Sequence, residues 1–192
     1  MKKKIIKIGV SGDVGSFSEM SAKSYITTKH LNAELSYLID MEGVLKALER
    51  KSIHYGIFPI FNSNSGLVKE ALRAMGKYKF CPINQVKLRV RQCLLSLPGA
   101  KIGKIKKIYS YSQPFIQCSK FIKQRLPKAK LFKWADTGKA ARDLSLGKFG
   151  EDSAVIATEN AAKVYGLQIL ASKIENSKNN ITTFIIVKKL KL

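Results

Sequence analysis

Cysteine and histidine are scarce in this chain, which limits the kinds of site that it can build. Its three cysteines, Cys81, Cys93 and Cys118, show no CxxC spacing, which argues against a disulfide framework and against a zinc site. The two histidines, His30 and His54, are too few for a histidine-based metal cluster. We therefore expect no bound metal, and we expect reduced, mostly buried thiols, because free cysteine packs as a small apolar group.

Long hydrophobic runs are also missing. No stretch approaches the roughly 18 apolar residues that a membrane-spanning helix needs. The N-terminus begins like a signal peptide, but Lys7 and Gly9 interrupt its apolar run almost at once, so a buried first strand behind a charged start explains it better. We expect a cytoplasmic protein that does not associate with membranes.

Acidic residues are few, 13 against 35 lysines and arginines, which gives a formal charge of +22. Such a charge suggests an anionic partner, namely nucleic acid, acidic lipid or a small acidic substrate. Proteins that read nucleic acids cluster their charge and rely on arginine, whereas here lysine dominates and is scattered over every segment. An AT-rich coding sequence would also produce this composition. We expect a small anionic ligand and no nucleic-acid partner.

The pattern alternates short apolar runs with amphipathic stretches, which is typical of an α/β protein. With 192 residues, 45% of them hydrophobic, the chain can bury a core as one domain or two small lobes. The sequence predicts strands at 5–10, 34–38, 55–60, 83–97, 105–110, 130–134, 154–157 and 182–187. It predicts a helix that opens after Ser16 and runs to about residue 30, and a helix capped by Asp40 with Val44, Leu45 and Leu48 on its apolar face. Further helices are predicted at 67–75, 113–125, 137–146 and 159–165.

Polar loops follow several of the predicted strands. Residues 12–18 follow the first strand, residues 62–66 the third, and residues 110–113 a strand of the second half. Open α/β sheets bind ligands outside the carboxyl ends of their strands, and helix N-termini there present N–H groups to anions. Periodicity therefore predicts an anion-binding cleft without identifying the anion.

Five segments, in this order and spacing, resemble the motifs of the prephenate dehydratase family. The segments are Gly12-Asp13-Val14-Gly15-Ser16-Phe17-Ser18-Glu19, Gly56–Val68 with Phe61-Asn62-Ser63, Ser110–Cys118, Ala161–Leu167, and Asn179-Asn180-Ile181-Thr182-Thr183-Phe184. Each motif alone is weak, since glycine-rich turns recur by chance. Together they cover nearly the whole chain.

The resemblance implies an α/β fold of two lobes, similar to periplasmic binding proteins, with the active-site cleft between the lobes. Lobe one would comprise residues 1–78 plus 179–192, and lobe two residues 79–178. The family commonly continues into a regulatory ACT domain at the point where this chain ends, and no chorismate mutase helix precedes it. Feedback control by phenylalanine through that domain is therefore not expected. Family habit implies a homodimer or a higher homo-oligomer.

The resemblance also implies the reaction, a cofactor-free conversion of prephenate to phenylpyruvate with loss of water and CO2 in phenylalanine biosynthesis. Thr182 corresponds to the threonine most closely tied to catalysis in the family. Since a threonine hydroxyl is a poor proton source, we expect it to donate a hydrogen bond to the departing oxygen. The residues expected to bind the substrate are Gly15, Ser16, Asn62, Ser63, Gln113 and Phe184. Taken singly, such residues are common at caps and turns.

Four departures from the family pattern leave other readings open. Thr183 stands where the family usually has arginine, and Thr cannot act as a bidentate carboxylate partner. Phe61 stands where it usually has glutamate, and Tyr111-Ser112 replace His-Pro. Alternatives are a related enzyme such as a non-aromatising decarboxylase of prephenate, or an inactive module that binds a small anion. The decarboxylating branch tends to lack the threonine that this chain keeps as Thr182.

Overall fold

The computed structural model describes residues 5–190 and divides them into two compact units. Unit 1 holds the residues up to Asp13, Phe17–Arg89 and those from Ile181 onward. Unit 2 holds Val14–Ser16 and Val90–Asn180. The charged start of the chain, residues 1–4, and the last two residues lie outside the described part.

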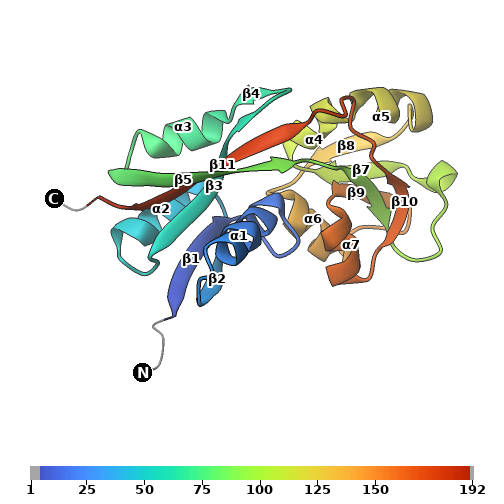
Figure 1. Cartoon of the computed structure of the whole chain (residues 1–192). Coiled ribbons are helices and arrows are strands. Elements are labelled where there is room, and N and C mark those ends of the chain that lie inside the picture. Colours follow the sequence, from blue (N-terminus) through green and yellow to red (C-terminus); the bar gives the residue numbers. More distant parts are fainter. Residues whose placement is uncertain (1–4, 191–192) are drawn as a thin grey trace. The chain divides into compact units, whose positions relative to one another are not determined.

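Unit 1 is built on a mixed sheet whose main strands run in the order β2-β1-β3-β11-β5 (Figure 1). Strands β1, β2 and β3 are parallel, whereas β11 lies antiparallel between β3 and β5. The short strand β4 pairs with the end of β3. The strands are β1 (Ile6–Ser11), β2 (Ala33–Leu38), β3 (Tyr55–Asn62), β4 (Gly66–Leu67), β5 (Phe80–Arg89) and β11 (Ile181–Lys189).

Helices cover both faces of this sheet. Helix α1 (Phe17–Thr28) packs on the face that carries Ile8, Phe184 and Ile186. Helices α2 (Met41–Glu49) and α3 (Lys69–Met75) pack on the face that carries Phe58, Ile185 and Val187. Asp40 caps α2 as the sequence predicts, because its carboxylate accepts the backbone N–H of Gly43 at 2.7 Å.

Unit 2 has a five-stranded sheet in the order β10-β6-β9-β7-β8. Strands β7, β8 and β9 are parallel, whereas β6 and β10 are antiparallel to their neighbours. The strands are β6 (Cys93–Ser96), β7 (Lys107–Ser110), β8 (Lys130–Lys133), β9 (Ser153–Ala157) and β10 (Gln168–Ser172). The helices are η1 (Ile102–Lys104), α4 (Ser112–Gln117), α5 (Ser119–Arg125), α6 (Thr137–Ser145) and α7 (Glu159–Tyr165).

A cluster of aromatic rings packs in unit 2 beside the buried carboxylate of Asp143. The rings of Tyr109 and Phe149 stack with centroids 3.8 Å apart, and Trp134 meets Phe149 edge-on. The indole N–H of Trp134 donates to Asp143, which Lys148 also contacts at 2.8 Å. Burial acts to raise the pKa of Asp143, but the hydrogen bonds from Lys148 and Trp134, together with the positive charges of Lys139 and Lys148, leave that pKa below its usual value.

Two predictions of local structure were wrong, each because of a break that the apolar pattern does not show, and one strand was missed. The single strand expected at 83–97 is two strands in different sheets, β5 and β6. The helix expected at 113–125 is interrupted at Cys118, whose ψ of 14° leaves the helical range. Strand β10 was not foreseen.

The boundary between the units also lies later in the chain than expected. The resemblance assigned residues 79–89 to the second lobe, whereas β5 pairs with β11 along its whole length. This pairing holds residues 80–89 in unit 1, and the chain enters unit 2 at Val90.

The buried thiols agree with the expectation from composition. Cys93 and Cys118 are buried, and burial raises the pKa of both thiols, so both stay protonated at neutral pH. Cys81 is partly exposed. Among the helices of residues 5–190, none has both the length and the apolar character needed to cross a membrane.

Candidate active site

The end of β3 and the start of β11 bring two of the predicted site residues into direct contact. Asn62 and Thr182 are cross-strand partners, 120 positions apart in the chain. The Asn62 side-chain Nδ2 donates a hydrogen bond to Thr182 Oγ1 at 2.8 Å. Asn62 is fully buried and Thr182 is 8% exposed, so this polar pair lies at the edge of the buried interior of unit 1.

The orientation of the Asn62 amide is set by its other contacts. Its Oδ1 accepts the backbone N–H groups of Asn64, at 3.0 Å, and Ser65, at 3.1 Å. Its Nδ2 also donates to the carbonyl of Ile181 at 3.3 Å. Because a backbone N–H can only donate and a carbonyl can only accept, these contacts fix which end of the amide faces Thr182.

Ser63 extends the pairing of the two strands by one residue. Its backbone N–H donates to the Ile181 carbonyl at 2.8 Å, and its hydroxyl accepts the Ile181 N–H at 2.9 Å. Ser63 itself is exposed. Unit 1 thus gathers Asn62, Ser63 and Thr182 at one end of the β3–β11 strand pair.

Phe184 lies deeper on the same face as Thr182. Successive side chains of a strand point to opposite faces, so Thr182, Phe184 and Ile186 share one face of β11. Phe184 is 1% exposed and belongs to the core cluster with Ile186 and with Tyr25 of α1. The predicted contact of Phe184 with substrate stays a prediction. Its observed contacts are those of a core residue supporting the start of β11.

Two of the departures from the family pattern lie on the other face of these strands. Thr183 alternates with Thr182, and its cross-strand partners are Phe61 on β3 and Lys87 on β5. Thr183 is 9% exposed and Phe61 is 41% exposed. Directly opposite residues on neighbouring strands point to the same side, so Phe61 and Thr183 form a pair on the face away from the Asn62–Thr182 bond.

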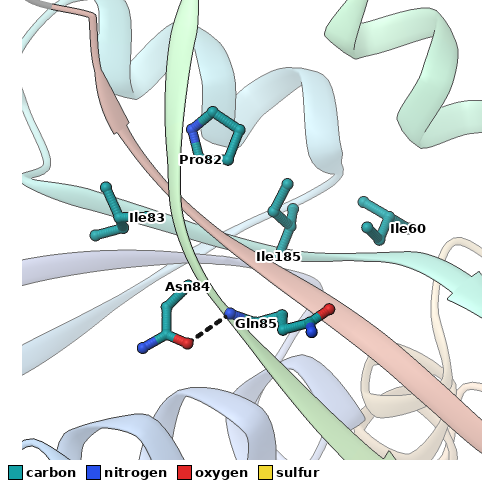
Figure 2. Close-up of a pocket in the computed structure, with 6 residues that line it drawn as sticks. All are labelled: Ile60, Pro82, Ile83, Asn84, Gln85 and Ile185. Carbon is teal, nitrogen blue, oxygen red and sulfur yellow. Dashed lines mark hydrogen bonds between the residues drawn. The ribbon is translucent and has the colours of Figure 1, made fainter.

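A shallow groove of about 310 Å³ lies farther along this second face (Figure 2). Figure 2 shows its lining residues on and beside the paired strands β5 and β11, where the Asn84 side-chain oxygen accepts the Gln85 N–H. None of the lining residues is charged, so the groove is poorly suited to a substrate with two carboxylates. The lining residues are Ile60, Pro82, Ile83, Asn84, Gln85 and Ile185.

In unit 2, the glycine-rich loop Val14–Ser16 is held by α7. The hydroxyl of Thr158 donates to the Gly15 carbonyl at 2.6 Å and accepts the Ala161 N–H at 2.9 Å, which also caps α7. The hydroxyl of Tyr165 donates to the Val14 carbonyl at 3.0 Å. Two successive carbonyls of the loop are therefore anchored to one helix.

Gly15 is the residue that allows this close approach. Its φ of +84° lies in the left-handed region, and a Cβ there would lie 2.9 Å from the Ala161 Cα. Ser16 follows it and is 4% exposed. Sequence reasoning missed Thr158, although a threonine directly before the predicted helix at 159–165 is the ordinary signal for an N-cap.

In the segment Ser110–Cys118, the side chains of Ser110 and Gln117 make hydrogen bonds within the described part of the fold, whereas that of Gln113 does not. The hydroxyl of Ser110 donates to the Ile156 carbonyl at 2.7 Å. Gln117 Oε1 accepts from Gln92 at 3.1 Å and from Asn180 at 3.2 Å. Gln113, on the first turn of α4, is partly buried, and its side chain makes no hydrogen bond within residues 5–190. It remains the residue of this segment best suited to contact a ligand.

The two remaining departures, Tyr111 and Ser112, lie at the start of α4. Tyr111 precedes the helix in extended conformation, and Lys133 Nζ lies 5.9 Å from the centroid of its ring. Ser112 begins the helix. Within the described residues, no three His, Cys, Asp or Glu side chains gather as metal ligands would.

A comparison with protein families matches residues 8–191 to the prephenate dehydratase model. A bifunctional chorismate mutase/prephenate dehydratase from Buchnera aphidicola subsp. Baizongia pistaciae is 33% identical over 99% of this chain and 51% of its own length. An Arabidopsis thaliana protein named arogenate dehydratase/prephenate dehydratase 2 is 29% identical over 95% of this chain and 46% of its own. The chain thus spans about half the length of the curated relatives it matches.

Solved structures share the fold. A prephenate dehydratase from Arthrobacter aurescens, crystallised with L-Phe, superimposes with a TM-score of 0.82 at 22% identity, covering 97% of this chain and 61% of that one. A periplasmic substrate-binding protein from Coxiella burnetii gives a TM-score of 0.50 at 16% identity, covering 94% and 84%. The fold is thus the α/β type shared with periplasmic binding proteins, as predicted. Because the family model spans nearly every residue and includes both strands of the Asn62–Thr182 pair, this chain belongs to the prephenate dehydratase family.

Proposed function

We propose that this chain is a prephenate dehydratase that converts prephenate to phenylpyruvate in phenylalanine biosynthesis, without a cofactor. The observation that carries the proposal is the intact Asn62–Thr182 pair at the end of β3 and β11. The Arg-to-Thr and Glu-to-Phe departures lie on the opposite face of the same strands. These two departures therefore leave the groups that hold Thr182 unaltered.

The reaction sets clear demands on the protein. The bond from the ring to its carboxylate breaks and releases CO2, and its electron pair enters the ring as the bond to the 4-hydroxyl breaks. Hydroxide leaves and takes a proton from solvent to become water, while aromatisation supplies the driving force. A group that stabilises charge on the departing oxygen accelerates this step, because that charge appears only in the transition state.

We assign that role to the Thr182 hydroxyl. An alcohol is too weak an acid to give up its proton, but it can donate a hydrogen bond to the departing oxygen as negative charge develops there. Preorganised donors of this kind typically contribute about 10²–10³-fold to kcat. Thr182 suits the role because it is nearly buried and is held by a hydrogen bond from Asn62.

The remaining predicted contacts complete the proposal. In unit 2, Gly15 and Ser16 lie in the anchored loop, whose conformation would present donors to a carboxylate, and Gln113 would orient the ring or its hydroxyl. In unit 1, Ser63 lies beside the Asn62–Thr182 pair, and Phe184 packs in the core two residues after Thr182 on β11.

The test is an assay of the purified chain with prephenate at neutral pH, in which phenylpyruvate formation is followed and Thr182→Ala is the control. L-arogenate is assayed in parallel, because a plant relative is named for both substrates. Thr182-dependent phenylpyruvate supports the proposal. Consumption of prephenate without phenylpyruvate would instead favour a non-aromatising decarboxylase, and no consumption of either substrate would favour a module that only binds small anions.

We further propose that the chain acts as a cytoplasmic homodimer whose partner is its small anionic substrate. Neither nucleic acid nor membrane is part of the proposal, since the positive charge is spread over every segment and consists mostly of lysine. Light scattering of the purified chain should give a mass of twice 21.4 kDa. Affinity for DNA that falls steeply with added salt would point to nucleic acid instead.

A further inference from the structure

The hydrogen bond between Asn62 and Thr182 has a direction that its surroundings impose. Asn62 Oδ1 is engaged by the backbone N–H groups of Asn64 and Ser65, so it faces away from Thr182. The group that faces Thr182 Oγ1 is the amide nitrogen, which can only donate. The threonine oxygen is therefore the acceptor in this bond.

The direction of this bond determines where the Thr182 hydroxyl can donate its hydrogen. A hydroxyl has one hydrogen and two lone pairs, and its hydrogen rotates to suit its partners. With the Asn62 amide hydrogen occupying one lone pair, the threonine hydrogen is turned away from Asn62. Thr182 is thus held as a donor toward a third group.

We infer that Asn62 is a positioning residue, which orients the Thr182 hydroxyl as a donor to the departing oxygen of the substrate. This inference rests on the proposed function and refines the expected role of Asn62 as a substrate contact. Burial supports the refinement, since Asn62 is fully buried and both ends of its amide are already engaged by protein groups. Thr182, in contrast, retains some exposure.

The substitution Asn62→Asp tests the direction of this bond while preserving the turn. One carboxylate oxygen replaces Oδ1 and still accepts the N–H groups of Asn64 and Ser65. The other replaces the donor with an acceptor, so the Thr182 hydroxyl must now donate to it and is lost to the substrate. We expect kcat for prephenate to fall about 10²-fold, as for loss of one donor, with KM changed less than about twofold.

Asn64→Asp is the matched control, because it introduces the same charge two residues away at an exposed position whose side chain does not contact Thr182. It should leave kcat and KM within about twofold of the parent chain. A rise in KM with little change in kcat for Asn62→Asp would show that Asn62 binds the substrate directly and would overturn the inference.

A pH profile provides a readout that a merely structural role would not produce. When the carboxyl group introduced by Asn62→Asp is protonated, it can again donate to Thr182 Oγ1. Burial raises the pKa of a carboxyl group, so kcat of this variant should recover as the pH falls through that raised pKa, whereas the parent chain and Asn64→Asp should show no such rise. An enzyme-free blank at each pH removes acid-catalysed conversion of prephenate. A kcat equally low at every pH argues against the orienting bond.

Two further measurements separate this inference from the proposed function. In the Thr182→Ala background, Asn62→Asp should reduce kcat no further, because both changes remove the same donor. Independently of turnover, Thr182→Val should shift the Asn62 side-chain amide resonances in a ¹⁵N–¹H spectrum and speed their hydrogen exchange. Unchanged resonances would disprove the bond and the inference even in an active enzyme. Shifted resonances in a chain that does not consume prephenate would uphold the orienting bond and reject the proposed reaction.

Discussion

The two faces of the β3–β11 strand pair differ in how closely they keep to the family pattern. One face carries Asn62 and Thr182, which are joined by a 2.8 Å hydrogen bond above the buried ring of Phe184. The other carries Phe61 opposite Thr183, at two positions where glutamate and arginine are usual in the family. Neighbouring residues of each strand point to opposite faces, yet both departures in these two motifs, Phe61 and Thr183, lie on the same face.

This difference shows that distance along the sequence is a poor measure of closeness to a reacting group. Thr183 adjoins Thr182 in the chain, but its side chain points to the opposite face of the strand. The two replacements also face each other across the strands, so they form one coupled change rather than two independent losses. Substitutions that contrast a residue of one face with a residue of the other therefore test the difference directly.

The largest expected effect is on stability. Phe184→Ala removes a ring that is 1% exposed and should lower the free energy of unfolding by about 3–5 kcal/mol, because the cavity cannot be refilled fully. Phe61→Ala, at a position 41% exposed on the other face, should cost about 0.5 kcal/mol. Urea unfolding of both variants measures the difference. Equal losses would mean that Phe61 is covered in the protein as it exists in solution.

The second contrast concerns catalysis. Thr182→Ala should reduce kcat for prephenate by about 10²–10³-fold through loss of a donor to the departing oxygen. Thr183→Ala, one residue later on the other face, should change kcat by less than about threefold. Steady-state kinetics with circular dichroism as a check of folding compares the two. If the two variants lose similar activity, the substrate contacts both faces and the distinction fails.

Much of the local structure follows from short-range signals in the sequence. Asp40 and Asp136 cap their helices through the N–H three residues ahead, and Gly166 ends α7 with a left-handed φ of 64°. The strands at 55–60 and 182–187 were predicted from their apolar residues; β3 continues to Asn62, and β11 runs from Ile181 to Lys189.

Other features depend on partners far along the chain and left no local signal. Val86 and Leu88 alternate like a strand that continues through Val90, but the alternation does not show that the chain leaves one sheet at Val90 for another. The motif resemblance predicted Asn62 and Thr182 as site residues. Only the register of β3 and β11 shows that the two side chains contact each other, and that Phe61 meets Thr183 on the reverse face.

The smallest expected effect tests the coupling of the two replacements. Thr183→Arg alone places a guanidinium directly opposite Lys87, and like charges on facing strands destabilise a sheet. Adding Phe61→Glu supplies an opposite charge on the other neighbouring strand. The double variant should therefore be more stable than the sum of the single variants by about 0.2–1 kcal/mol, as measured by urea unfolding in a double-mutant cycle.

Activity in the same cycle distinguishes the two faces more sharply than stability does. Because positions 61 and 183 lie away from the Asn62–Thr182 bond, kcat and KM for prephenate should stay within about threefold of the parent chain in all three variants. A tenfold fall in KM with Thr183→Arg would show that a guanidinium at this position reaches a substrate carboxylate, as bidentate arginine contacts do. The loss of arginine would then be a change in substrate binding, and the faces would not be separate in function. Additive stabilities with unchanged kinetics would keep the faces distinct, but would show the two replacements to be independent of each other.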